Sequence, residues 1–333
     1  MTTAARYDVV AIGNAIVDVI ARAEDAFITE RDLTKGSMRL IDTAEAENLY
    51  AAMGPGIEMS GGSAANTLAG MAALGRQCAF IGQVADDQLG KVFRHDLRAT
   101  GVAFDTAVQA GDPPTARCLI LVTPDGQRTM NTYLGASQFL GAQAIDDALI
   151  ADGAILYLEG YLWNADASRA AMAQAIAVAK QAGRRVAFTL SDSFVVHGHG
   201  DDFRRMIANG DIDILFANEA EITALAGVEE FDAAVAAIAA QVPLLIATRS
   251  EHGACAVEGG VRVDVPAEPI DHVVDTTGAG DLFAAGVLAG LGEGRSLHQC
   301  LQMGAVCARI IIAQVGPRAQ EDLRAAVDAK LAG

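Results

Sequence analysis

The sequence is poor in the features that mark disulfide-rich, membrane-spanning and secreted proteins. Its 333 residues include five scattered cysteines with no C-x-x-C pair, which favours reduced thiols over a disulfide framework or a zinc site. No uninterrupted apolar run reaches the length of about 18 residues that a membrane span needs. Residues 1–8 also lack the apolar core of a signal peptide. These absences predict a cytoplasmic protein with no membrane partner.

Positive charge is scarce as well. The chain carries 24 Lys and Arg against 42 Asp and Glu, a formal net charge of −18. Because nucleic-acid binding needs a broad basic surface, no nucleic-acid partner is expected. An anionic nucleotide would have to be held by backbone dipoles, a few cations and Mg²⁺. Neither G-x-x-x-x-G-K-[ST] nor a G-x-G-x-x-G after a strand is present, which excludes typical P-loop kinases and typical Rossmann dehydrogenases.

The most informative stretch runs from Asp275 to Asp281, with the sequence Asp-Thr-Thr-Gly-Ala-Gly-Asp. It leads into residues 282–291, which carry no charge and are expected to form a helix buried on nearly all sides. Amides at a helix N-terminus have no partner within the helix, and Gly278, Ala279 and Gly280 leave room for a phosphate beside them. Asp281 would then accept the proton of an attacking hydroxyl. The alternative is a tight turn with Asp281 as a helix cap.

Polar residues also follow the first expected strand. Residues 7–13 are typical of a buried parallel strand, and Asn14 and Asp18 come after it, where open α/β sheets bind ligands. Their amide and carboxylate groups suit vicinal sugar hydroxyls; the alternative is a turn Asn and a surface Asp. A second glycine-containing loop, residues 61–67, precedes an apolar helix expected at residues 68–74. This loop includes Gly61, Gly62, Ser63 and Asn66.

The remaining pattern predicts a single α/β domain over residues 1–333. From residue 145 onward, apolar strands alternate with helical runs, as in a parallel sheet flanked by helices. Residues 115–122 and 128–134 are expected to form an antiparallel hairpin, and residues 17–21 and 38–42 short, partly exposed strands. These segments predict a separate small sheet, a lid formed by about residues 14–45 and 112–135. A lid would keep water away from a phosphoryl transfer.

Two later strand ends carry polar residues. Asn218 ends the strand expected at residues 212–217, and Glu221 shares its face, which suits either a helix-capping pair or water-bridged oxygen ligands of Mg²⁺. The next buried strand turns through a glycine-containing loop that includes Thr248 and Gly253. Residues 197–202 contain His and Asp side chains, but we interpret them as a polar loop ahead of a helix at 202–209, not as a metal cluster.

These motifs, in this order, resemble those of the ribokinase-like (PfkB) kinases from about residue 9 to residue 312. The resemblance implies an α/β, ribokinase-like three-layer sandwich, in which helices flank a central, mostly parallel sheet and a small β lid is added. It also implies an anion hole at Gly278, Ala279 and Gly280 and a catalytic base at Asp281.

The same resemblance implies the rest of the site. The sugar would be bound by Asn14, Asp18, Gly61, Gly62, Ser63 and Asn66, with Arg128 of the lid reaching the phosphoryl group; the alternative is a solvated hairpin Arg. ATP would be bound by Asn218, Thr248, Gly253, Gly278 and Gly280, and Mg²⁺ by Glu221 through water. Ser250 stands where the family usually has Gly. The implied cofactors are ATP and Mg²⁺, and a monovalent cation such as K⁺ near Asp271 and Gly316 is left open.

The implied activity is ATP-dependent phosphorylation of a primary hydroxyl. Gly13-Asn14 with Asp18, and residues 214–219 and 308–312, resemble the family's adenosine kinases more than its ribokinases, which favours conversion of adenosine to AMP. A nucleoside base needs an apolar slot, for which the candidates are Met38, Leu40, Leu134, Tyr161 and Trp163. The alternatives are a ribokinase-type sugar kinase, an inosine or guanosine kinase, and a non-catalytic nucleotide or nucleoside sensor. The expected partners are small molecules, and the expected state is a monomer or a homodimer.

Overall fold

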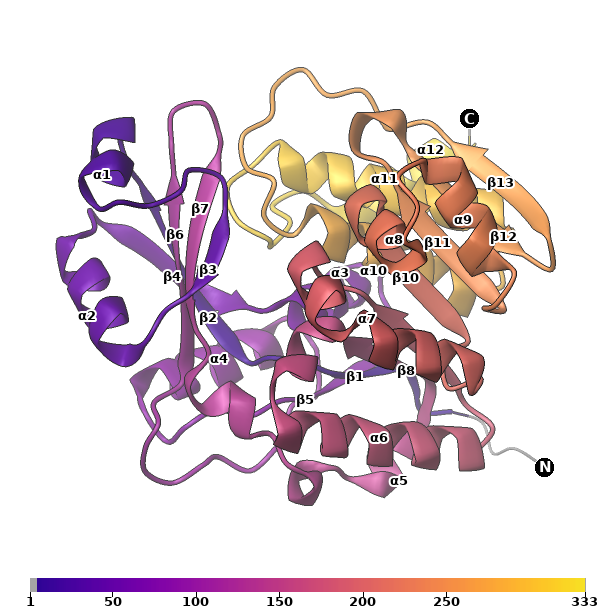
Figure 1. Ribbon diagram of the computed structural model, residues 1–333, viewed down its shortest axis with the longest axis horizontal. Helices are drawn as coiled ribbons and strands as arrows, with labels where there is room; N and C mark the ends of the chain where they lie inside the picture. The colour runs from indigo at the N-terminus through magenta and orange to yellow at the C-terminus, as the bar shows by residue number, and fades with distance from the viewer. Residues whose placement is uncertain (1–4, 333) are drawn as a thin grey trace.

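A computed structural model describes residues 5–332 and contains two β-sheets (Figure 1). Within this part of the chain the larger sheet has eight strands. In spatial order they are β13 (Val261–Val265), β12 (Ala254–Glu258), β11 (Leu244–Thr248), β10 (Ile214–Asn218), β9 (Arg185–Thr189), β8 (Gly153–Glu159), β1 (Tyr7–Ile12) and β5 (Cys78–Ile81). Strands β5, β1, β8, β9, β10 and β11 run parallel to one another. Strands β12 and β13 are added antiparallel at one edge. Residues 1–4, which belong to the stretch inspected for a signal peptide, lie outside the described residues.

The central strand β1 has apolar side chains on both faces. Val9 and Ala11 belong to the hydrophobic core on one side of the sheet, and Val10 and Ile12 to the core on the other. Because successive side chains of a strand point to opposite faces, only a continuously apolar segment can fill such a position. The buried parallel strand predicted at residues 7–13 is thus confirmed.

Helices cover both faces of the larger sheet (Figure 1). The first core contains residues of α3 (Ser63–Ala73), α4 (Gln88–Ala99), α10 (Ala279–Gly292), α11 (Leu297–Ile312) and α12 (Leu323–Ala332). The second contains residues of α5 (Asp147–Ala151), α6 (Asp166–Gln181), α7 (Ser193–Ala208), α8 (Glu219–Ala226) and α9 (Phe231–Ala239). The helix predicted from the uncharged run is α10, which packs against α3 and α11 and buries every residue from 282 to 290.

The smaller sheet stands apart from the larger one, at the left of Figure 1. In spatial order its strands are β3 (Met38–Leu40), β7 (Arg128–Tyr133), β6 (Ala116–Val122), β2 (Ile16–Arg22) and β4 (Gly56–Gly61). The predicted hairpin is confirmed, since β6 and β7 pair antiparallel. Strand β4 lies outside the two segments expected to build the lid.

Strand β2 is buried, whereas the sequence pattern predicted partial exposure. Val19 packs with Leu119 under α1 (Asp25–Glu30) and α2 (Thr43–Ala52), while Ile16 and Ile20 belong to the opposite face of the small sheet. The helices therefore cover one face of this sheet, and the other face is turned toward the larger part of the molecule.

Two helices begin earlier than predicted. Helix α3 starts at Ser63, directly after Gly62 with φ of 89°, so Ser63 and Asn66 lie in its first turn instead of in a loop before residue 68. Helix α7 starts at Ser193, where Asp192 caps it by accepting a hydrogen bond from the Phe194 amide at 3.0 Å. Residues 197–202 are therefore helical, and the interpretation as a loop was wrong.

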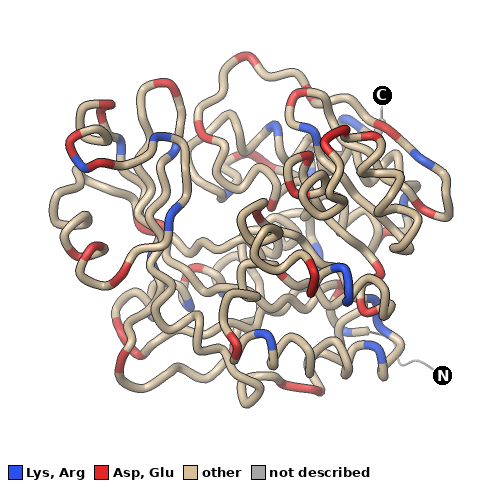
Figure 2. Tube along the Cα trace, viewed as in Figure 1, with Lys and Arg blue, Asp and Glu red and all other residues tan. Residues whose placement is uncertain are grey.

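Charged residues are dispersed over the molecule. Figure 2 shows the Lys and Arg positions scattered among more numerous Asp and Glu positions. None of the helices in residues 5–332 combines the length and apolar character needed to cross a membrane.

Candidate active site

A cavity of about 300 Å³ lies between the carboxyl ends of the main strands and the inner face of the small sheet. Residues that follow or end β1, β8, β10 and β11 line it together with residues of β2, β3, β6 and β7. The structure brings together most residues predicted for the site, namely Asn14, Asp18, Gly62, Ser63, Asn66, Arg128, Asn218, Glu221, Thr248, Gly278, Ala279, Gly280 and Asp281. Gly61 and Gly253 are not part of the lining.

The loop before α10 is held by a buried carboxylate. Asp275 is fully buried; its Oδ1 accepts hydrogen bonds from the amide and the hydroxyl of Thr277 at 2.9 and 2.6 Å, and its Oδ2 accepts one from the Gly316 amide at 2.9 Å. Gly278 adopts a left-handed φ of 78°, and a Cβ there would lie 2.7 Å from the Cβ of Pro317. Only glycine fits this position. The result is a rigid turn that presents the N-terminus of α10 to the cavity, where unpaired helix amides attract an anion.

The Asp281 carboxylate is anchored by the first turn of α3. Its Oδ1 accepts a hydrogen bond from the Ser63 hydroxyl at 2.6 Å, and its Oδ2 accepts one from the Asn66 amide nitrogen at 2.9 Å. Burial raises the pKa of Asp281, and these two hydrogen bonds together with Arg128 and Arg318 oppose the rise. A carboxylate with a raised pKa is a stronger proton acceptor than an ordinary aspartate.

A buried glutamate at the end of β8 orients Asn14. The Oε1 atom of Glu159 accepts hydrogen bonds from the Asn14 backbone amide at 2.7 Å and from its side-chain nitrogen at 2.8 Å. Its Oε2 accepts one from the Ala64 amide at 2.9 Å, which joins β8 to α3. Burial raises the pKa of Glu159 to about 7. A Cβ on Gly13 would lie 2.7 Å from Glu159 Oε2, so glycine makes room for this arrangement.

Asp18 is a second buried acid in the cavity. It lies on β2 and is only 5% exposed, and burial raises its pKa to about 7 even though Arg318 and Arg128 lower it. Gly61 on the neighbouring strand β4 makes this position possible, because a Cβ there would lie 2.1 Å from Asp18 Oδ2. Gly61 therefore serves the site by leaving room for the Asp18 carboxylate, without lining the cavity itself.

Sequence reasoning missed Glu159 and Arg318. Glu159 gives a readable signal, since it is a lone charge at the end of the apolar strand β8, the same kind of position that singled out Asn14. Arg318 gives none, because it follows α11 in an irregular segment. Its guanidinium donates to Asn66 Oδ1 and to Ser60, far away in sequence.

Apolar residues also line the cavity. Of the residues predicted for a base slot, Met38, Leu40, Leu134 and Tyr161 line it, and Ile16, Ile120, Met130 and Phe194 join them. Trp163 does not. Its ring packs edge-on against Phe188 and Phe203, and its indole nitrogen donates to Asp202 at 2.8 Å, so it belongs to the core.

The Asn218 and Glu221 pair forms a capping box at the start of α8. Asn218 Oδ1 accepts from the Glu221 amide at 2.9 Å, and the Glu221 carboxylate accepts from the amide and the side-chain nitrogen of Asn218 at 2.9 and 2.7 Å. Burial raises the pKa of Glu221 to about 7. Because its oxygens already accept two hydrogen bonds, Glu221 fits a metal held through water better than direct coordination. In the described residues no three His, Cys, Asp or Glu side chains form a metal-binding group.

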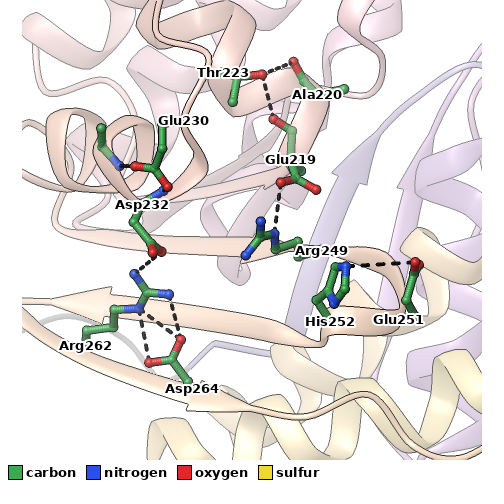
Figure 3. Close-up of polar contacts among 11 residues, drawn as sticks. Glu219, Ala220, Thr223, Glu230, Asp232, Arg249, Glu251, His252, Arg262 and Asp264 are labelled. Carbon is green, nitrogen blue, oxygen red and sulfur yellow. Dashed lines mark hydrogen bonds and ion pairs between the residues drawn. The ribbon is translucent and has the colours of Figure 1, made fainter.

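The loop after β11 is tied to α8 by an ion pair (Figure 3). Arg249 donates its Nε to Glu219 at the start of α8 at 2.9 Å and lies 4.9 Å from the centre of the Phe231 ring. Ser250, in place of the usual glycine, adopts a left-handed φ of 44° in the short 3-10 turn Ser250–His252. Gly253 has φ of 90°, and a Cβ there would lie 2.1 Å from the Val265 carbonyl oxygen, so it shapes the turn behind Thr248.

Comparison with known proteins identifies the family. The pfkB family carbohydrate kinase profile matches residues 8–323. The crystal structure of adenosine kinase from Sinorhizobium meliloti is 49% identical, with a TM-score of 0.94 over 99% of this chain and 100% of that one. A probable sugar kinase from Rhizobium etli is 46% identical, with a TM-score of 0.94 over 98% of each chain. The adenosine kinase of Saccharomyces cerevisiae is 27% identical over 92% of this chain and 95% of that protein. These matches confirm the predicted ribokinase-like fold and kinase chemistry, and the chain belongs to the pfkB family of carbohydrate kinases.

Proposed function

We propose that this kinase transfers the γ-phosphoryl group of ATP to the 5′-hydroxyl of adenosine, producing AMP and ADP. The observation that carries the proposal is the position of the Asp281 carboxylate, at the N-terminus of α10 and inside a cavity lined by both polar and apolar side chains. A nucleoside needs both, since its ribose is polar and its base is flat and largely apolar. The relative from Sinorhizobium meliloti is described as an adenosine kinase and is 49% identical.

The ribose is assigned to polar residues of the cavity. With its amide nitrogen bound to Glu159, Asn14 offers its amide oxygen to a sugar hydroxyl, and Asp18 offers a buried carboxylate. Both are acceptors, which suits the two vicinal hydroxyls of ribose as donors. Asn66 and Gly62 line the same cavity. The apolar residues Leu40, Met130 and Leu134 are assigned to the base.

The transfer itself is assigned to the N-terminus of α10. Asp281 accepts the proton of the 5′-hydroxyl of the nucleoside. The hydroxyl oxygen forms the new bond to the γ-phosphorus, and the bond between the γ-phosphorus and the oxygen that links it to the β-phosphate of ATP breaks. The amides at Gly278, Ala279 and Gly280 stabilise the charge on the phosphoryl oxygens. Arg128 of β7 lies in the cavity lining and supplies the cation of the lid.

Kinases of the family bind ATP with Mg²⁺, and we propose the same pair here. Asn218, Thr248 and the loop closed by Gly253 are assigned to the nucleotide. Glu221 would hold Mg²⁺ through water, and the ion would neutralise charge on the phosphates. Activation by a monovalent cation stays open, as the sequence left it.

A free sugar is the second candidate substrate, because the Rhizobium etli relative with 46% identity is described as a probable sugar kinase. The test is a coupled ADP-release assay with Mg-ATP and a panel of adenosine, inosine, guanosine, ribose and fructose. Turnover that depends on adenosine at micromolar concentration is the expected result. Turnover with a free sugar alone would keep the chemistry and overturn the substrate, and silence over the whole panel would favour a nucleoside sensor.

A further inference from the structure

Arg318 lies behind the candidate base and takes part in none of the roles assigned above. It lies between α11 and α12, in a segment of the chain that contacts the loop before α10 and the small sheet. In this segment the Gly316 amide binds Asp275 of the anion loop, and Val315 packs against the small sheet. The side chain of Arg318 is absent from the cavity lining. Any effect it has on the reaction must therefore pass through another residue.

The contacts of Arg318 point to that residue. One guanidinium nitrogen donates to Asn66 Oδ1 at 2.5 Å, and the other donates to the backbone oxygen and the hydroxyl of Ser60 at 2.6 and 3.0 Å. Asn66 is 3% exposed and Ser60 is 1% exposed, so neither contact is exchanged freely with water. Ser60 belongs to β4 of the small sheet, and its amide donates to Asp96 of α4 at 3.2 Å.

The chemistry of these groups fixes the orientation of the Asn66 amide. A guanidinium is a donor only, so it can meet only the oxygen end of that amide. The nitrogen end must then face Asp281, whose ionised carboxylate is an acceptor only, and it donates to Oδ2 at 2.9 Å. Without Arg318 the oxygen end of the amide loses its donor, and only the hydrogen bond to Asp281 then holds the Asn66 side chain in place.

We propose that Arg318 is a positioning residue for phosphoryl transfer: it locks the Asn66 amide, which in turn holds the Asp281 carboxylate in the orientation for proton abstraction, and it ties this pair to strand β4 of the small sheet. The inference rests on the proposed function, because it takes Asp281 as the base. Misplacing a catalytic group by about 1 Å can cost about 100-fold in rate, so a residue outside the cavity can matter this much.

Charge gives Arg318 a second, separable effect. The charged groups that face it are Asp18 of β2, Asp281 of α10 and Asp96 of α4. Burial lowers the pKa of Arg318 to about 10, which leaves it cationic at neutral pH. Its charge lowers the pKa of Asp18 and of Asp281, alongside Arg128 of β7; Asp281 and Asp275 raise the pKa of Asp18. Removing the charge should therefore move the acid limb of the kcat/KM profile to higher pH, and by more than removing the fork geometry alone, which costs Asp281 only the Asn66 hydrogen bond.

The experiment is a double-mutant cycle of Arg318→Met with Asn66→Ala, read as kcat on the high-pH plateau, where both acids are ionised. Arg318→Met should lower kcat by about 10- to 100-fold in the wild-type background and by little in the Asn66→Ala background. Arg324→Met is the matched control, because it removes a cation of α12 whose partners are Glu293 and Asp328, and its kcat should not change.

Arg318→Lys separates geometry from charge and replaces the Met variant in the cycle if that variant does not fold. An ammonium keeps the charge but cannot reproduce the fork that spans Asn66 and Ser60, so kcat on the high-pH plateau should still fall, while the acid limb moves less than in Arg318→Met. The proposal is overturned if the Arg318 substitution lowers kcat by the same factor in the wild-type and the Asn66→Ala backgrounds. It is also overturned if kcat is near normal in both Arg318 variants. Asp281→Asn is measured alongside. Near-normal turnover in this variant would show that Asp281 is not the base. If Asp281→Asn is inactive but the Arg318 and Asn66 substitutions lower kcat independently of each other, only the role of Arg318 is overturned.

Discussion

At the scale of single residues, the site depends on acids that are kept out of water and on glycines that make room for them. Asp18 and Glu159 are each buried, and each lies where a Cβ on the adjacent glycine, Gly61 or Gly13, would meet its carboxylate. In the sequence such glycines are seen only as parts of loops. Why glycine is required at these positions becomes clear only when the carboxylate that faces each of them is known.

Gly61→Ala tests the role of this glycine. The added Cβ would lie 2.1 Å from Asp18 Oδ2, so the carboxylate must rotate away from its place in the cavity. We expect KM for the nucleoside to rise by at least about tenfold, the size of one lost hydrogen bond to a charged group, with the folded state retained. Gly198→Ala on the exposed face of α7 is the control, since nothing lies within 4 Å of a Cβ there. Equal KM values for the two variants would contradict the role of Gly61.

At the scale of elements, most strands were predictable and several helix starts were not. The strand β1, the hairpin β6–β7 and the helix α10 follow from continuous apolar runs, alternation and the absence of charge. The start of α3 was missed because it follows a glycine with positive φ and has no side-chain cap, so no local signal marks it. Strand β4 was missed because it is glycine-bounded and half exposed, and it is a strand only through its pairing with β2.

The early start of α3 has a chemical consequence, which Ser63→Ala tests. In a helical first turn the Ser63 hydroxyl reaches Asp281 at 2.6 Å and stabilises the ionised carboxylate, which lowers its pKa. Without this hydrogen bond the pKa of Asp281 rises, so we expect the acid limb of the kcat profile to move to higher pH. Ser168→Ala in α6 is the control, because its buried hydroxyl has no partner. An unshifted limb in Ser63→Ala would show that this contact does not tune the base.

The candidate site was predictable as far as its residues follow motifs. Asn14 and Asp18, Asn66, and Asp281 come from three separate segments, and the structure brings them into one cavity. Trp163 was misassigned because an aromatic side chain near a strand end fits a pocket and a core equally well. Arg318 could not be found at all, since its partners Asn66 and Ser60 are more than 250 positions away.

At the scale of the whole molecule, buried acids make the ligand-free protein sensitive to pH. Burial raises the pKa of Asp18 from 3.8 and of Glu159 from 4.5 to about 7 in each case. The folded state therefore binds these protons more tightly than the unfolded chain. Their contribution to stability is complete below about pH 4 and is lost as the pH rises through 7. At neutral pH the ionised Asp18 and Glu159 thus lower the free energy of unfolding, and in return they provide hydrogen-bond acceptors inside the site.

Urea unfolding at pH 5 and pH 8 measures this effect. The free energy of unfolding of the wild type should fall between the two pH values, and Asp18→Asn should abolish about 2–3 kcal/mol of that fall. The reason is that from pH 5 to about 7 the folded protein keeps the Asp18 proton while the unfolded chain has lost it, which changes stability by about 1.4 kcal/mol for each pH unit. The exposed Glu47→Gln of α2 should leave the fall unchanged. A fall of the same size in Asp18→Asn and in the wild type would contradict the buried-acid account.

The central claim is that Asp281 accepts the proton of the attacking hydroxyl, and one variant tests it most directly. Asp281→Asn keeps the size of the side chain but offers no carboxylate as a proton acceptor. Its kcat with adenosine and Mg-ATP should fall by about 10²- to 10⁴-fold, the usual contribution of a general base. Calorimetry should show adenosine still binding with little change in Kd, because Asn14 and Asp18 hold the ribose. Turnover within about tenfold of the wild type, with adenosine bound normally, would contradict the mechanism.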